Sequence, residues 1–223
     1  MLKFHLLGRP QISLDDQPVM GFASEKELLL LCYLLLNPGE HSRPQLAGLL
    51  WGEMSEERAR ANLSTAVYNL RQLLPNAIEA NRKTAVFNPD QPVWLDTAVL
   101  QQAIHADDET LATAVGLYRG PFLEGVYPRD APELEAWLQQ ERERWRLLAL
   151  TGLDRLAHSQ THAGEWAAAI ATLRRLLTIE PWREESHRAL MRLLARTGQF
   201  NAALVQYETC RALLLDELGV EPM

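Results

Sequence analysis

The side chains best suited to binding a ligand lie on one predicted helix, residues 56–74. At about 100° per residue, its apolar side chains fall on one narrow arc that must face a core: Ala59, Leu63, Ala66, Val67, Leu70 and Leu74. The opposite arc collects polar side chains: Arg58, Arg60, Asn62, Ser64, Thr65, Tyr68, Asn69, Arg71 and Gln72. No carboxylate interrupts residues 58–72, although acidic residues outnumber basic ones in the whole chain.

This polar arc has the chemistry of a helix that binds duplex DNA. Arg, Ser, Thr and Tyr side chains donate hydrogen bonds to phosphate oxygens, and Asn, Gln and Arg side chains pair with base edges. A helix about 10–12 Å in diameter also fits the major groove. The alternative is an ordinary solvated face. The next segment favours DNA, because Arg82 and Lys83 stand at the tip of a predicted hairpin, where a wing would contact phosphates or the minor groove.

The elements around this helix predict a winged helix-turn-helix domain over residues 1–96. Two alternating runs, Leu2–Leu6 and Gln11–Leu14, predict a small antiparallel sheet at the N-terminus. Helices are expected after Ser24, which forms a capping box with Glu27, and over residues 44–50, before Ser55 caps the polar helix. Three short strands are expected after it: Ala77–Ala80, Thr84–Phe87 and Val93–Leu95. Sheet, three helices and hairpin is the order of a winged helix.

Residues 97–223 read as a second, α-helical domain. A long helix is predicted over Glu133–His158, and three more helices follow it. The last region repeats itself at an offset of 34 residues: Gly164, Trp166, Ala168, Ala169 and Ile170 reappear as Gly198, Phe200, Ala202, Ala203 and Leu204. This period predicts tetratricopeptide-like stacking, with the aromatic residue wedged between helices. A plain helical bundle, and a concave peptide groove between the repeats, are the alternatives. The fold class is therefore mainly α with a small β component.

Composition limits the partners and the compartment. The net charge is −7, and residues 1–96 carry 9 Lys/Arg against 11 Asp/Glu, so DNA contact must come from a local basic patch. Cys32 and Cys210 both read as buried thiols of a reducing compartment. The apolar run Leu28–Leu36 is far shorter than the about 20 residues that cross a bilayer. We therefore expect a cytoplasmic protein with no membrane partner.

Other chemistry has little support. His158 and His162 have the spacing of a metal pair, but no third ligand follows at a useful distance, so no metal is expected. No nucleophile motif and no Gly-x4-Gly-Lys-Ser/Thr phosphate loop occurs. The sequence therefore predicts no cofactor and no enzymatic activity.

Four motifs give the chain a family resemblance. They are Leu46–Gly52, Ala59–Arg71, Tyr118–Leu123 and Leu214–Pro222. With these motifs the chain resembles the SARP family of bacterial transcription activators, in which an OmpR-type winged helix precedes a bacterial transcriptional activator domain. The resemblance implies binding to double-stranded promoter DNA, often at direct repeats by side-by-side protomers, and hence a homodimer on DNA. It also implies contact with RNA polymerase subunits.

The resemblance also assigns residues. It would place Ser64, Thr65, Tyr68 and Asn69 in the major groove, Arg60 and Arg71 on phosphates, and Arg82 and Lys83 on the wing; the amide of Gln72 joins them as a group that can pair with a base edge. Family members usually carry a basic residue at the position of Asn69 and often a His at that of Ala66. This low basicity keeps an alternative open, a protein-interaction scaffold that acts through its helical repeats and binds DNA weakly or not at all.

Overall fold

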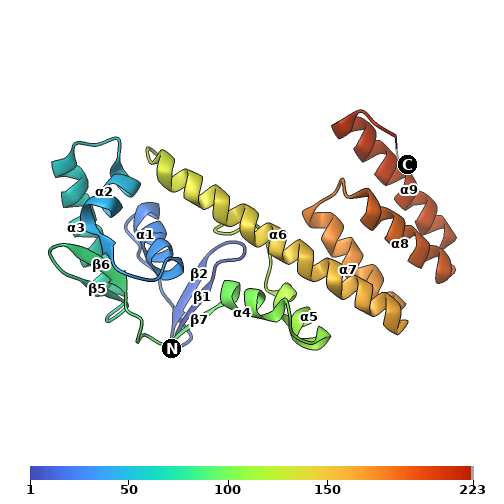
Figure 1. Cartoon of the computed structure of the whole chain (residues 1–223), viewed down its shortest axis with the longest axis horizontal. Coiled ribbons are helices and arrows are strands. Elements are labelled where there is room, and N and C mark those ends of the chain that lie inside the picture. Colours follow the sequence, from blue (N-terminus) through green and yellow to red (C-terminus); the bar gives the residue numbers. More distant parts are fainter. Residues whose placement is uncertain (222–223) are drawn as a thin grey trace. The chain divides into compact units, whose positions relative to one another are not determined.

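The computed structural model describes residues 1–221 and divides the chain into two compact units (Figure 1). The N-terminal unit consists of Met1–Ala98 and Arg119–Arg144, and the C-terminal unit of Val99–Tyr118 and the residues from Trp145 onward. Pro222, the last residue of the fourth family motif, lies outside the described residues. The units cut across the predicted division after residue 96, because residues 119–144 pack with the N-terminal residues. The division into domains 1–96 and 97–223 stays a prediction.

The N-terminal unit begins with a four-stranded sheet in the order β3-β2-β1-β7, formed by Gln17–Pro18, Gln11–Leu14, Leu2–His5 and Val93–Leu95. The predicted antiparallel pairing of β1 with β2 is confirmed, with Phe4 opposite Ile12. Strand β7 runs parallel to β1 and brings Asp96 to the end of that strand. The buried Asp96 carboxylate accepts hydrogen bonds from the Leu6 and Leu7 amides at 2.7 and 2.9 Å, which closes this end of the sheet.

The third family motif, Tyr118–Leu123, extends this sheet. Leu7 and Phe122 form an antiparallel bridge, and the amide of Leu123 donates to the carbonyl of Leu6 at 2.9 Å. The two chains approach closely at Gly8, whose φ is +116° and where a Cβ atom would lie 3.2 Å from the Cβ of Arg119. A glycine is therefore required at this crossing. These backbone contacts place residues 119–144 in the N-terminal unit.

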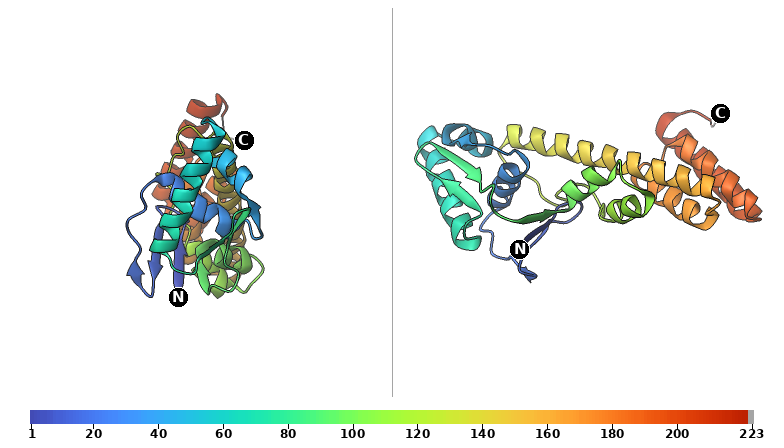
Figure 2. Two further views of the ribbon diagram at one scale, coloured as in Figure 1. Left: turned by 90° about the vertical axis from the view of Figure 1, so that its left-hand side faces the viewer. Right: turned by 60° about the horizontal axis from the view of Figure 1, so that its bottom comes forward.

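The rest of the N-terminal unit is the predicted winged helix. Helices α1 (Glu25–Leu36), α2 (Arg43–Trp51) and α3 (Glu56–Leu73) are followed by a three-stranded sheet in the order β4-β6-β5, formed by His41–Ser42, Thr84–Phe87 and Ile78–Ala80. Ser24 caps α1 as predicted by accepting a hydrogen bond from the Glu27 amide. Helix α3 and the β5–β6 hairpin lie side by side in all views (Figure 1, Figure 2).

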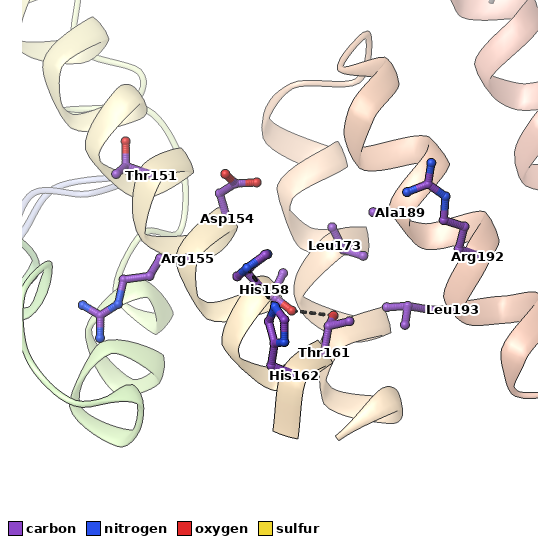
Figure 3. A pocket seen from close by; sticks show the side chains of 11 residues that line it. Thr151, Asp154, Arg155, His158, Thr161, His162, Leu173, Ala189, Arg192 and Leu193 are labelled. Atoms are coloured by element: carbon purple, nitrogen blue, oxygen red, sulfur yellow. Dashed lines mark hydrogen bonds between the residues drawn. The ribbon is translucent and has the colours of Figure 1, made fainter. Parts of the chain in front are cut away.

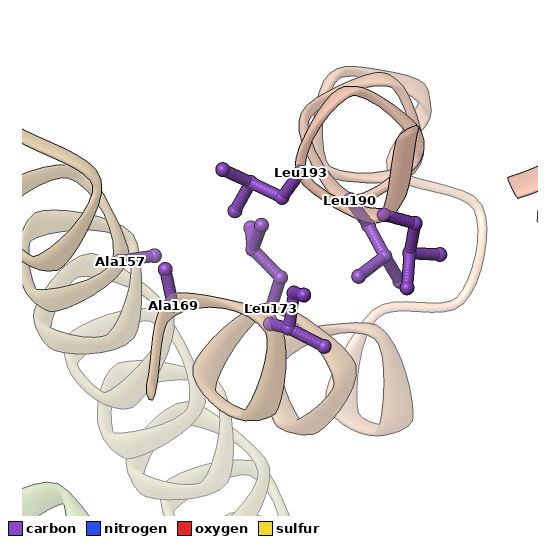
Figure 4. Close-up of a cluster of buried hydrophobic side chains, with 7 residues drawn as sticks. Ala157, Ala169, Leu173, Leu190 and Leu193 are labelled. Atoms are coloured by element: carbon purple, nitrogen blue, oxygen red, sulfur yellow. The ribbon is translucent and has the colours of Figure 1, made fainter. Parts of the chain in front are cut away.

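Helices make up the C-terminal unit. Its residues belong to α5 (Asp108–Gly116), α7 (Trp166–Ile179), α8 (Glu184–Arg196), α9 (Phe200–Leu218) and parts of α4 (Asp96–Ala103) and α6 (Pro132–Ala163). The predicted long helix is confirmed as α6, and the three helices expected after it are α7, α8 and α9. Ala157 of α6, Leu173 of α7 and Leu193 of α8 meet in one buried cluster (Figure 4).

The 34-residue repeat has a structural counterpart. Gly164 and Gly198 have nearly the same left-handed conformation, with φ of +78° and +77°, and each precedes a helix that begins two residues later. The aromatic residues differ. Trp166 packs beside the buried cluster and under the Arg196 guanidinium, 4.2 Å from the ring centre, whereas Phe200 is 65% exposed. The prediction that the aromatic residue is wedged between helices is therefore wrong for Phe200. Within residues 1–221, no helix covers the face of α9 that carries Phe200 in the way that α8 covers α7.

Candidate nucleic-acid interface

Helix α3 presents its polar arc to solvent. Its buried residues are those expected from the periodicity: Ala59, Leu63, Ala66, Val67 and Leu70. Seven polar residues of the opposite arc are exposed: Arg58, Arg60, Ser64, Thr65, Tyr68, Arg71 and Gln72. Tyr68 stands out, because 63% of its surface is exposed although the side chain is large and aromatic. Such a ring, with a phenolic donor, is free to meet a base edge or a phosphate.

Two hydroxyls of this arc are already bonded to their own helix. Ser64 donates to the Arg60 carbonyl at 2.8 Å, and Thr65 donates to the Ala61 carbonyl at 3.2 Å. The Ser64 oxygen in turn accepts a hydrogen bond from the Arg43 guanidinium at 2.8 Å. In this arrangement Ser64 orients Arg43 toward the surface.

Asn69 is held by a helix far from it in sequence. Its side-chain amide donates to the carboxylate of Glu27 on α1 at 2.7 Å, and Glu27 is only 5% exposed. The same carboxylate accepts the Ala23 amide at 2.9 Å. Asn69 is half-buried. Its hydrogen bond to Glu27 links α3 to α1 and uses one of the two hydrogens of the Asn69 amide group.

Four cationic side chains surround one groove. The groove has a volume of about 530 Å³ and lies among the start of α2, the middle of α3 and the tip of the hairpin. Its lining residues are Ser42, Arg43, Pro44, Arg60, Leu63, Ser64, Arg82 and Lys83. The structure thus brings together four predicted residues, Arg60, Ser64, Arg82 and Lys83. Thr65, Tyr68, Asn69, Arg71 and Gln72 lie elsewhere on α3.

Arg43 is a member of this groove that the sequence reasoning missed. It is the first residue of α2, where a positive charge meets the positive end of the helix dipole. An arginine in that unfavourable place was the available signal, because it indicates a role other than helix stability. Arg60 is partly neutralised, since it forms an ion pair with Glu56 one turn earlier.

The tip of the hairpin is closed by side-chain hydrogen bonds. The Asn81 side-chain oxygen accepts hydrogen bonds from the Lys83 and Thr84 amides at 2.7 and 2.8 Å, and its amide group donates to the Thr84 hydroxyl at 2.9 Å. The Arg43 amide donates to the Lys83 carbonyl at 2.8 Å, which joins the wing to the start of α2. Arg82 and Lys83 are both exposed on this fixed turn.

The geometry suits an anionic polymer. Arg43, Arg82 and Lys83 form no ion pair with any residue of 1–221, so their charge is available to phosphate groups. The exposed arc of α3 starts at this protein groove. Its size allows it to enter the major groove of duplex DNA while the β5–β6 hairpin follows the phosphate backbone of the DNA. Among the described residues, no group of three or more His, Cys, Asp or Glu side chains could hold a metal ion, and no helix is long and apolar enough to cross a bilayer.

Comparison with known proteins relates the chain to bacterial transcription regulators. A family model described as "Bacterial transcriptional activator domain" matches residues 96–223. Regulatory protein AfsR of Streptomyces coelicolor is 31% identical over 237 residues, which cover 99% of this chain and 23% of AfsR. Transcriptional regulatory protein EmbR of Mycobacterium bovis is 28% identical, over 99% of this chain and 60% of EmbR. The chain therefore spans only part of these relatives.

A solved structure has the same fold. Mycobacterium tuberculosis EmbR, determined in complex with a low-affinity phosphopeptide, superposes with a TM-score of 0.70 and 26% sequence identity, and the match covers 100% of this chain and 62% of EmbR. The family model covers more than half of the chain. The chain belongs to the bacterial transcriptional activator domain family, as its resemblance to the SARP regulators predicts.

Proposed function

We propose that the chain is a sequence-specific transcription activator that binds double-stranded promoter DNA through its N-terminal unit. One observation carries this proposal. A protein with a net charge of −7 gathers Arg43, Arg60, Arg82 and Lys83 around one groove, directly beside an exposed helix face that has no carboxylate between residues 58 and 72. A local cationic site in an acidic chain favours an anionic ligand at that site and disfavours unspecific binding elsewhere.

Each part of the interface has its own role. Arg43, Arg82 and Lys83, with Arg60 and Arg71, hold phosphates and set the register of the protein on the duplex. Thr65, Tyr68 and Gln72 face base edges in the major groove. Ser64 orients Arg43, and Asn69 fixes the tilt of α3 through Glu27. In the free protein Ser64 and Asn69 thus act as positioning residues, and their contact with base edges stays a prediction.

The C-terminal half supplies the activating function in this proposal. The family match over residues 96–223 and the named regulators among the relatives support the division into a DNA-binding domain, 1–96, and an activator domain, 97–223. The activator domain would contact RNA polymerase subunits, with protomers side by side on direct repeats. Such a regulator works on bacterial DNA in the cytoplasm and needs no enzymatic step.

Selection from random duplex DNA tests the proposal. The purified full chain is incubated at low salt with a pool of random duplexes, and bound DNA is amplified over several rounds. We expect one enriched motif that occurs as a direct repeat. A pool that stays random after selection would overturn the proposal and leave the protein-interaction scaffold as the function.

A further inference from the structure

A second groove lies in the C-terminal unit, bounded by α6, α7 and α8 (Figure 3). Its volume is about 540 Å³. Ala157 of α6, Leu173 of α7 and Leu193 of α8 form the floor, and all three belong to the buried cluster. Ala189 of α8 is also part of the lining. Because the residues at positions 157 and 189 are alanines, the helices pack around the cluster and still leave an apolar depression above it.

The wall on α6 carries polar groups on one helix face. Asp154, His158 and His162 follow one another at four-residue spacing and line the groove. The Nε2 atoms of the two imidazoles are 3.0 Å apart and share one hydrogen bond, so both Nδ1 atoms remain available to a ligand. Asp154 forms an ion pair with Arg183, whose Nη2 lies 3.4 Å from its Oδ2.

The opposite wall carries a free positive charge. Arg192 of α8 is exposed, lines the groove and forms no hydrogen bond or ion pair with any residue of 1–221. Arg155 also lines the groove, but its guanidinium donates to the Ile104 carbonyl at 2.5 Å and pairs with Asp108 at 3.3 Å. Arg192 is therefore the cation that can receive a ligand anion.

These features select one class of ligand. An apolar floor takes an aliphatic or aromatic side chain, and an unpaired guanidinium across the groove from an imidazole N–H donor takes a carboxylate. An open groove that crosses successive helices of a repeat suits an extended peptide. We propose that this groove binds an acidic peptide segment of a partner protein, with an apolar side chain against Leu173 and Leu193 and a carboxylate on Arg192.

Peptide selection on the full chain tests this site. A displayed library of random peptides, each about twelve residues long, is panned against the immobilised protein, and enriched peptides are labelled for fluorescence anisotropy. We expect enriched sequences that combine Leu, Ile, Met or Phe with a neighbouring Asp or Glu. Arg192→Glu reverses the free charge and Ala189→Phe fills the depression, so each should weaken binding about tenfold or more.

The control is Arg174→Glu, which makes the same charge change at an exposed position of α7 outside this groove and should leave affinity within about twofold. Circular dichroism melting checks that every variant is folded. If Ala189→Phe does not fold, the affinity of Arg192→Glu alone tests the proposal. The proposal is overturned if no peptide is enriched, if the enriched peptides lack acidic residues, or if Arg192→Glu binds them as the wild type does. The proposal would also be overturned if the protein dimerises and Arg192→Glu abolishes the dimer, because a second copy of the chain would then occupy the groove.

Discussion

Two polar side chains of α3, Ser64 and Asn69, are engaged by other groups of the free protein. Ser64 accepts a hydrogen bond from Arg43, and Asn69 donates one to the buried Glu27. Both contacts fix the position of a neighbour, a cation in one case and a whole helix in the other. At the scale of single residues, the site therefore combines cations that form no ion pair within residues 1–221, such as Arg43, with polar groups that fix their neighbours.

Arg43→Ala tests the cation that the sequence reasoning missed. Losing one phosphate contact should weaken binding to all DNA sequences alike by about fivefold, or about 1 kcal/mol, without a change in base preference. Fluorescence anisotropy with the selected duplex and a scrambled one measures this. Arg129→Ala removes an exposed arginine of the same unit outside the groove, and should have no effect. Equal losses in the two variants would refute the role of Arg43.

Asn69→Ala tests the contact with α1. The Glu27 carboxylate loses a donor while it stays buried, so the free energy of unfolding should fall by about 1–2 kcal/mol. Urea denaturation measures the loss. Gln72→Ala, on the exposed arc of the same helix, should leave stability unchanged within about 0.5 kcal/mol. If both variants are as stable as the wild type, Asn69 is not a positioning residue.

Asp96 gives a prediction about pH. Burial raises the pKa of its carboxyl group, against the lowering effect of the hydrogen bonds from the Leu7, Leu6 and Thr97 amides. The folded state therefore holds this proton more tightly than the unfolded state, and the contribution of Asp96 to stability falls as pH rises from the unfolded pKa of about 3.8 through the folded value.

The comparison with Asp96→Asn, which cannot titrate, isolates this effect. Denaturation curves over a pH series give the difference in unfolding free energy between the wild type and the variant. We expect the advantage of the wild type to shrink as pH rises through that window. An advantage that grows with pH would mean that the hydrogen bonds outweigh burial.

At the scale of elements, turns decide how the functional surfaces are presented. The Asn81 side chain closes the tip of the hairpin, so Arg82 and Lys83 are held on a fixed turn. In the C-terminal unit, Gly164 and Gly198 end helices in a left-handed conformation and start the next helix at equivalent positions. The repeat in sequence is thus first of all a repeat of turn geometry.

The two turn glycines can be tested by alanine substitution. At φ of +78° and +77° an alanine is strained, so Gly164→Ala and Gly198→Ala should each lower stability by about 1 kcal/mol. Gly48 lies inside α2 with open space around its Cβ position, and Gly48→Ala should raise stability by roughly 0.5–1 kcal/mol. Thermal unfolding compares the three variants. Stabilisation by all three would contradict the proposed turn role.

At the scale of the whole molecule, periodicity made most of the fold predictable. The apolar arc of α3 and the alternation in β1 and β2 are local patterns, so the sequence reveals them directly. The contact between Asn69 and Glu27 joins residues far apart in sequence, and residues 119–123 pair with Leu6–Gly8 through backbone groups alone. Neither leaves a local signal. The 34-residue repeat likewise predicts the position of Phe200 at the start of a helix, but it does not reveal that no other helix buries the ring.

In our proposal, a cationic groove beside α3 holds DNA phosphates in an otherwise acidic protein. Salt titration of binding to the selected duplex tests it directly, with the wild type against a variant in which Arg43, Arg82 and Lys83 are all alanine. Each lost phosphate contact removes about 0.9 from the slope of log affinity against log salt, so the variant should lose roughly two to three units of slope. An unchanged slope would contradict this role of the groove, because the phosphates would then be bound elsewhere.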